Sequence, residues 1–175
     1  GASYNTVIGN TVLANDAGGV VVEAGIPFVI EASIPVDVDP PDPPIEPEFG
    51  VPSNNNRIED NILENGGLYV SDSNNTRIIN NTVQESSSGI SLENAHNSLI
   101  QNNDVRGNLS GIDLYGSTGN RIESNNASEI SGSGIELQSL SLNNQIVLNT
   151  VSYNDSDGIS VLDAAAAVNE NGGPY

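Results

Sequence analysis

Two consecutive stretches of the chain decide its fold. Residues 74–95 read NNTRIINNTVQESSSGISLENA, and residues 96–117 read HNSLIQNNDVRGNLSGIDLYGS. Each stretch places an isoleucine, Ile78 or Ile100, three residues before an asparagine, and each contains Gly-Ile-x-Leu further on. Self-similarity at a fixed period is the signature of a repeat architecture. We therefore expect further copies of this pattern elsewhere in the chain.

The same pattern recurs six times. The apolar residues that precede the recurring asparagine are Val7, Ile58, Ile78, Ile100, Ile122 and Ile146. The asparagines are Asn10, Asn61, Asn81, Asn103, Asn125 and Asn149, and a glycine follows each of them by six to nine residues. Four columns of the six repeats make 24 positions, and all are apolar, whereas a content of 36% predicts about nine. The repeat is therefore real.

The spacing within each repeat predicts strands. Apolar residues alternate with a period of two, as in Gly-Ile-Asp-Leu, and a single coil of about 22 residues cannot bury its apolar face alone. Stacking the coils about 4.8 Å apart pairs every strand with its equivalents above and below. We therefore expect an all-β fold, a parallel β-helix of about six coils. The asparagines should occupy bends and form an inward ladder of amides, and the glycines should mark a second sharp corner.

The segments NNTRIINNTV…SGISL, HNSLIQNNDV…SGIDL and TGNRIESNNA…SGIEL resemble right-handed parallel β-helix repeats. Such repeats occur in carbohydrate-binding and sugar-hydrolase modules, in pectate-lyase-like enzymes and in periplasmic copper-delivery accessory proteins. The resemblance covers residues 53–163 and 3–25, and it implies the right-handed sense that parallel crossovers favour. It is specific for the fold and says little about function, because the repeat consists mostly of core and turn residues.

One long insertion interrupts the repeat. We expect a single domain over residues 1–175, with an extended acidic, proline-rich arm at 26–52 and a C-terminal tail at 164–175. The arm alternates like a strand and then stiffens at DPPDPPIEP. Three interpretations stay open: a surface loop, an arm that adds a strand to another chain, and a calcium site made by Asp37, Asp39 and Asp42.

The charge balance excludes several partners. The chain has 23 acidic residues, four arginines and no lysine, so its net charge is -19. Such a field repels nucleic acid and anionic membranes, and no apolar stretch is long enough for a membrane span. The lysine-free surface, rich in Asn, Ser and Thr, indicates an extracellular or cell-surface location. The absence of Cys and Met counts against copper.

The outward positions of the second strand provide the candidate site. Asp113 and Glu136 fall on adjacent coils there, with Glu93 and Tyr115 nearby. Two carboxylates at this range could act as acid and base in glycoside cleavage, contact a sugar or hold a cation such as calcium. The alternative is a solvated acidic face, which 23 acidic residues make common.

The other ionisable residues offer less chemistry. Arg57, Arg77 and Arg121 share one column and should form surface ion pairs with Glu59 and Glu123. His96, the single histidine, falls among polar turn residues and cannot build a metal site alone. The sequence contains no Ser-His-Asp set and no phosphate loop.

Two functions therefore remain in play. The first is a non-catalytic extracellular structural protein that self-associates end to end, through its open ends or through the arm. The alternative is a carbohydrate-binding or carbohydrate-active module that uses Asp113 and Glu136 and takes a polysaccharide as partner. No cofactor is predicted, with calcium as the one option. We also expect Asn103 to matter more for stability than Asn108, which we place in a variable turn.

Overall fold

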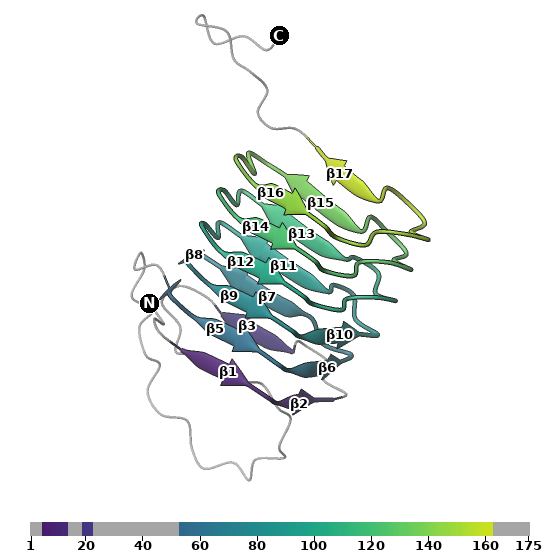
Figure 1. Cartoon of the computed structure of the whole chain (residues 1–175). Helices are drawn as coiled ribbons and strands as arrows, with labels where there is room; N and C mark the ends of the chain where they lie inside the picture. Colours follow the sequence, from purple (N-terminus) through teal and green to yellow (C-terminus); the bar gives the residue numbers. More distant parts are fainter. Residues whose placement is uncertain (1–4, 14–18, 23–52, 163–175) are drawn as a thin grey trace, which may run out of the picture.

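Stacked parallel strands make up the part of the chain that the structure describes, residues 5–13, 19–22 and 53–162 (Figure 1). The structure is a computed structural model, and its described residues form a β-solenoid without helices. The prediction of an all-β parallel β-helix is confirmed. The arm at 26–52 and the tail at 164–175 lie outside the described residues.

The first long sheet contains the anchor residues. Its six strands, in spatial order, are β1 (Thr6–Ile8), β5 (Arg57–Glu59), β9 (Arg77–Ile79), β12 (Leu99–Gln101), β14 (Arg121–Glu123) and β16 (Gln145–Val147). All neighbours in this sheet are parallel, and the register places Ile78 between Ile58 and Ile100. The anchor column predicted from the repeat is therefore a column of stacked residues.

The second long sheet contains the Gly-Ile-x-Leu segments. Its six strands, in spatial order, are β17 (Ile159–Val161), β15 (Ile135–Gln138), β13 (Ile112–Tyr115), β11 (Ile90–Glu93), β7 (Leu68–Ser71) and β3 (Val20–Val22). Ile112 pairs with Ile90 on one side and with Ile135 on the other. We call the outward side of this sheet the outer face.

Two short sheets complete the walls. One contains β2 (Thr11–Val12), β6 (Ile62–Glu64) and β10 (Thr82–Gln84), and single bridges continue it through Asp104 and Asn126 to Thr150. The other contains β4 (Ser53–Asn54) and β8 (Ser73–Asn74), continued by a bridge from Asn74 to His96. Each full coil therefore has four sides and four corners.

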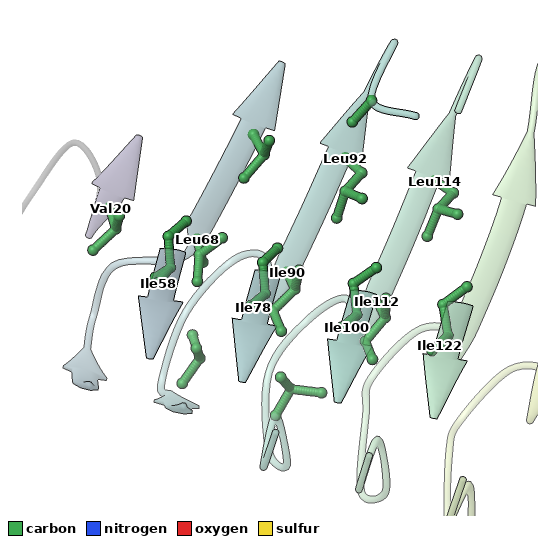
Figure 2. Packing of buried hydrophobic residues seen from close by; sticks show 14 of the residues in the cluster. Val20, Ile58, Leu68, Ile78, Ile90, Leu92, Ile100, Ile112, Leu114 and Ile122 are labelled. Atoms are coloured by element: carbon green, nitrogen blue, oxygen red, sulfur yellow. The ribbon is translucent and has the colours of Figure 1, made fainter. Parts of the chain in front are cut away.

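The core is a set of aliphatic columns inside these walls (Figure 2). Ile58, Ile78, Ile100 and Ile122 lie above one another, opposite the column that includes Ile90 and Ile112. These side chains are fully buried. Because each residue packs on the same kind of residue in the next coil, one coil supplies the apolar surface that another buries.

The recurring asparagines form a continuous ladder inside the solenoid. The Asn81 Nδ2 donates to Asn103 Oδ1 at 3.0 Å, and the Asn103 Nδ2 donates to Asn125 Oδ1 at 2.9 Å. The same Asn103 Nδ2 also donates to the Ile78 carbonyl at 2.9 Å. Equivalent amide bonds link Asn10 to Asn61, Asn61 to Asn81 and Asn125 to Asn149. The amides thus satisfy backbone groups that the bend leaves unpaired.

We expected the ladder asparagine to adopt the left-handed conformation at this bend. The residue before it does so instead. Positive φ angles occur at Gly9, Asp60, Asn80, Asn102, Ser124 and Leu148. Three more columns of positive φ mark the other corners. The preceding residue makes the turn, and the asparagine side chain then points inward to bond the neighbouring coils.

The glycines before the second strand lie at or near a bend, as expected, and several of them also serve close packing. None of Gly19, Gly67, Gly89, Gly111, Gly134 and Gly158 has a positive φ. A Cβ atom built on Gly111 would lie 2.0 Å from the Gly134 carbonyl oxygen, and one on Gly67 would lie 2.4 Å from the Ser88 carbonyl oxygen. The bend is thus made without a left-handed glycine, and at Gly67 and Gly111 consecutive coils approach too closely for a side chain.

Asn108 is also not in a variable turn. Its side chain is 1% exposed, and its Nδ2 donates to the carbonyls of Val83 and Val105, each at 2.8 Å. Its Oδ1 accepts from the Ser86 backbone N–H at 2.9 Å. The Asn108 side chain thus bonds to the backbone of the preceding coil at its own corner, as the Asn103 side chain does in the ladder.

Candidate functional site

The outer face brings five polar positions into one row. The alternation of Gly-Ile-x-Leu turns isoleucine and leucine inward, so the residue between them points outward. The register then aligns Tyr69, Ser91, Asp113, Glu136 and Ser160 across five consecutive strands. Asp113 and Glu136 are therefore direct neighbours on β13 and β15, as the sequence predicted.

Asp113 has an unusual environment for an outward carboxylate. Its side chain is half-buried, and its Oδ1 is buried without a hydrogen-bond partner. Burial, together with the negative charge of Glu136, raises the pKa of Asp113 to about 6, and a hydrogen bond with Ser110 partly opposes this rise. Asp113 therefore takes up a proton at a higher pH than an ordinary aspartate does.

A second row of residues runs beside the first. Glu93 pairs in register with Tyr115 on β13 and with Ser71 on β7. The Tyr69 hydroxyl donates a hydrogen bond to the Glu93 carboxylate, whereas the Tyr115 ring is 51% exposed. Glu93, Asp113, Tyr115 and Glu136 therefore lie on one continuous face, and the three acids among them are on three consecutive strands.

This arrangement can do some of what acid–base chemistry requires. A partly protonated Asp113 beside Glu136 provides one proton donor and one acceptor, the pattern of paired catalytic carboxylates. The four arginines of the chain lie elsewhere and are each bonded to an acid. The outer face thus provides carboxylates and aromatic rings without a positive charge of its own.

The arginine column forms the surface ion pairs that we predicted. Arg57 Nη2 lies 2.6 Å from Glu59 Oε2, and Arg77 Nε lies 3.5 Å from Glu59 Oε1. Arg121 Nε lies 2.8 Å from Glu123 Oε2. The hydrogen bond from Arg57 lowers the pKa of Glu59. These arginines are engaged on β5, β9 and β14, on the other long sheet.

His96 takes part in a local turn contact. Its Nδ1 accepts a hydrogen bond from the Thr118 backbone N–H at 3.1 Å and lies 2.9 Å from Thr118 Oγ1. Within residues 5–13, 19–22 and 53–162, no group of three or more His, Cys, Asp or Glu side chains could share a metal ion. The calcium candidates Asp37, Asp39 and Asp42 lie outside the described residues.

Sequence reasoning missed two further polar columns. At one, Asn120 Oδ1 accepts from the Ser98 backbone N–H at 2.8 Å, and Asn144 Oδ1 accepts from the Asn120 backbone N–H at 2.8 Å. Asn108 and Asn154 belong to the other. The signal was available in the sequence: these asparagines stand five residues before or after a ladder asparagine.

Comparison with known proteins identifies the family but not a close relative. The model of the family described as "Periplasmic copper-binding protein (NosD)" matches residues 46–171, most of the chain. The chain belongs to the NosD family. No curated protein and no solved structure matched significantly. The family description is of a periplasmic protein, which agrees with the broad prediction of a location outside the cytoplasm. Among the described residues, no helix is long and apolar enough to cross a membrane.

The donors of this member do not fit the copper in the family description. Copper(I) sites use thiolate and thioether sulfur, and copper(II) sites favour several imidazole nitrogens. The whole chain has no Cys, no Met and a single His, and the Nδ1 of that His96 already accepts a hydrogen bond. We therefore assign no copper chemistry to this chain.

Proposed function

We propose that this NosD-family chain is a non-catalytic β-helix module outside the cytoplasm, whose last coil pairs with a second copy of the chain. The observation that carries this proposal is the exposure of the last coil, residues 140–162. Ile159 and Val161 are 46% and 62% exposed, although their counterparts Ile112 and Leu114 in the fourth coil are buried. Apolar columns that end in exposed residues favour continuation of the stack by another chain.

Open strand edges support the same proposal. Among the described strands, β16 pairs only with β14, and β17 pairs only with β15. Their other edges present backbone N–H and C=O groups in the spacing that a further β-coil would match. Pairing there would satisfy these groups and cover Ile159 and Val161 together, adding main-chain hydrogen bonds to apolar burial.

The rim of the last coil is also apolar. Leu140, Leu148 and Tyr153 occupy left-handed corner positions, and Leu148 and Tyr153 are 80% and 86% exposed. Earlier coils place Asn, Asp, Gly, Ser or Glu at these corners. A bulky residue with positive φ costs energy and gains nothing in water. Residue types that are unfavourable for the local backbone conformation are expected where a surface is used for contact.

Charge sets the conditions under which association should occur. At -19 per chain two copies repel each other, and the last coil contributes Asp155 and Asp157 to this charge. Because salt screens this repulsion, association should strengthen as ionic strength rises.

Sedimentation velocity and light scattering at about 0.05 M and about 0.5 M sodium chloride test the proposal. We expect dimers or longer assemblies that grow with salt and that Val161→Glu abolishes. Ile62→Glu is the matched control, since Ile62 is an exposed apolar strand residue on the second coil, far from the last coil in the stack. Deleting residues 26–52 asks whether the arm contributes to the junction. A wild type that is monomeric at both salt concentrations would refute the proposal.

A second candidate function is polysaccharide binding at the outer face. It is favoured by the exposed ring of Tyr115 beside the carboxyl groups of Asp113 and Glu136, since sugar sites combine aromatic rings with carboxylate acceptors. Calorimetric titration with neutral and acidic polysaccharides, compared between the wild type and a double Asp113→Asn, Glu136→Gln variant, tests it. Reducing-end release in the same samples should stay at background, because we assign no catalysis to the chain.

A further inference from the structure

The junction between β13 and β15 contains a pair of carboxyl groups that pairing at the last coil does not use. Asp113 and Glu136 occupy directly paired positions of two parallel strands, which lie about 4.8 Å apart. Two ionised carboxylates at such neighbouring positions repel each other. The pair therefore destabilises the junction whenever both members are charged.

Asp113 cannot relieve this repulsion through its surroundings. Its Oδ1 is buried and has no hydrogen-bond partner, so no donor stabilises a negative charge on that oxygen. Ser110 provides a hydrogen bond to the carboxyl group. A buried oxygen without a donor is better matched by a protonated carboxyl group than by a carboxylate.

The charged groups around Asp113 all favour a proton on it. Glu136 faces it from β15, and Glu93 lies on β11 two residues beyond the directly paired Ser91. The other titratable groups of the two rows are Tyr69 on β7 and Tyr115 on β13 itself. No arginine faces this site, because the four arginines are bonded to Glu59, Asp104 and Glu123.

We propose that Asp113 and Glu136 form an acid-responsive pair that strengthens the junction between β13 and β15 when the medium becomes mildly acidic. One proton held by Asp113 removes the repulsion between the two carboxylates and turns the buried carboxyl group neutral. The remaining charge on Glu136 can then accept a hydrogen bond from the protonated group. This proposal concerns the inside of the stack and is independent of pairing at the last coil.

The direction of the effect follows from proton linkage. Burial and the charge of Glu136 raise the pKa of Asp113 to about 6 in the folded chain, whereas the unfolded chain has the ordinary value of 3.8. The folded state therefore binds more protons between these values, and stability rises as the pH falls through about 6. The gain levels off below about pH 4, where the unfolded carboxyl group is protonated too.

The primary experiment is a site-specific titration of Asp113. The Asp113 carboxyl carbon, followed by NMR in the wild type, should titrate near pH 6. In Glu136→Gln the midpoint should fall but stay above the ordinary value, because burial remains. A wild-type midpoint below about 4.5 would overturn the proposal.

Thermal unfolding at about pH 5 and about pH 7.5 measures the consequence. Asp113→Asn should raise the melting temperature at the higher pH by about 4–8 °C and reduce the gain on acidification by a similar amount. Asp60→Asn is the matched control: it removes one exposed negative charge at a left-handed corner, where Asn is equally suited. If the melting temperatures of Asp113→Asn and Asp60→Asn change with pH in the same way, the Asp113–Glu136 pair is not the source of the pH dependence. The proposal then fails.

Discussion

The fourth coil and the last coil of the solenoid use the same repeat in different surroundings. Ile112 and Ile159 hold the same position of that repeat, yet Ile112 is buried between two coils and Ile159 is half exposed. In the first coil, by contrast, Val7, Val12 and Val20 are all buried. The first and last coils that the structure describes therefore differ in the burial of these repeat residues. A residue of the repeat makes its full contribution to stability only where it is buried by the neighbouring coils.

The largest difference should appear in the isoleucine column. Ile112→Ala should lower the free energy of unfolding by about 2–5 kcal/mol, because the neighbouring coils bound the cavity that it leaves. Ile159→Ala should cost less than about 1 kcal/mol, since much of that side chain is already in water. Chemical denaturation of both variants checks the contrast. Equal losses would mean that the last coil is covered in solution.

The glycine column should show the same contrast. A Cβ atom on Gly111 meets the Gly134 carbonyl oxygen at 2.0 Å, whereas one on Gly158 meets nothing closer than 3.5 Å. Gly111→Ala should therefore cost about 1–3 kcal/mol or more, because the coils must move apart. Gly158→Ala should be close to neutral. Thermal unfolding of the two variants tests this, and a tolerated Gly111→Ala would show that the stack is looser than described.

The asparagine ladder extends the comparison between the fourth and the last coil to polar side chains. Asn103→Ala leaves buried partners unsatisfied, among them the Asn81 backbone N–H and the Ile78 carbonyl, at about 1–3 kcal/mol for the lost group. Asn149 is partly exposed, so water can replace its bonds and Asn149→Ala should cost less. Denaturant midpoints measure both. Asn108→Ala should resemble Asn103→Ala, since Asn108 is buried as well.

The smallest effect has the opposite sign. Leu148→Asn should stabilise the monomer by up to about 1 kcal/mol, because Asn tolerates the left-handed corner better than Leu. The same substitution should weaken self-association by removing an exposed apolar group from the rim. Melting temperature and sedimentation, measured on one sample, separate the two effects. A variant that is neither more stable nor less associated would argue against a role for the rim.

The sequence by itself determined the repeat, the strand period, the core columns and the ladder. Residues such as Ile78 and Asn81 recur at the same place in every coil, and a stacked repeat repeats the environment along with the residue. The same reasoning placed Asp113 beside Glu136, since adjacency of equivalent positions follows from the stack.

Only the tertiary structure decided how closely the coils approach and what each position is surrounded by. That distance explains why Gly111 admits no side chain. The packing of the coils also leaves Asp113 Oδ1 without a hydrogen-bond partner and Ile159 partly exposed to solvent. These properties depend on atoms contributed by neighbouring coils, and a residue's own type and spacing carry no information about them.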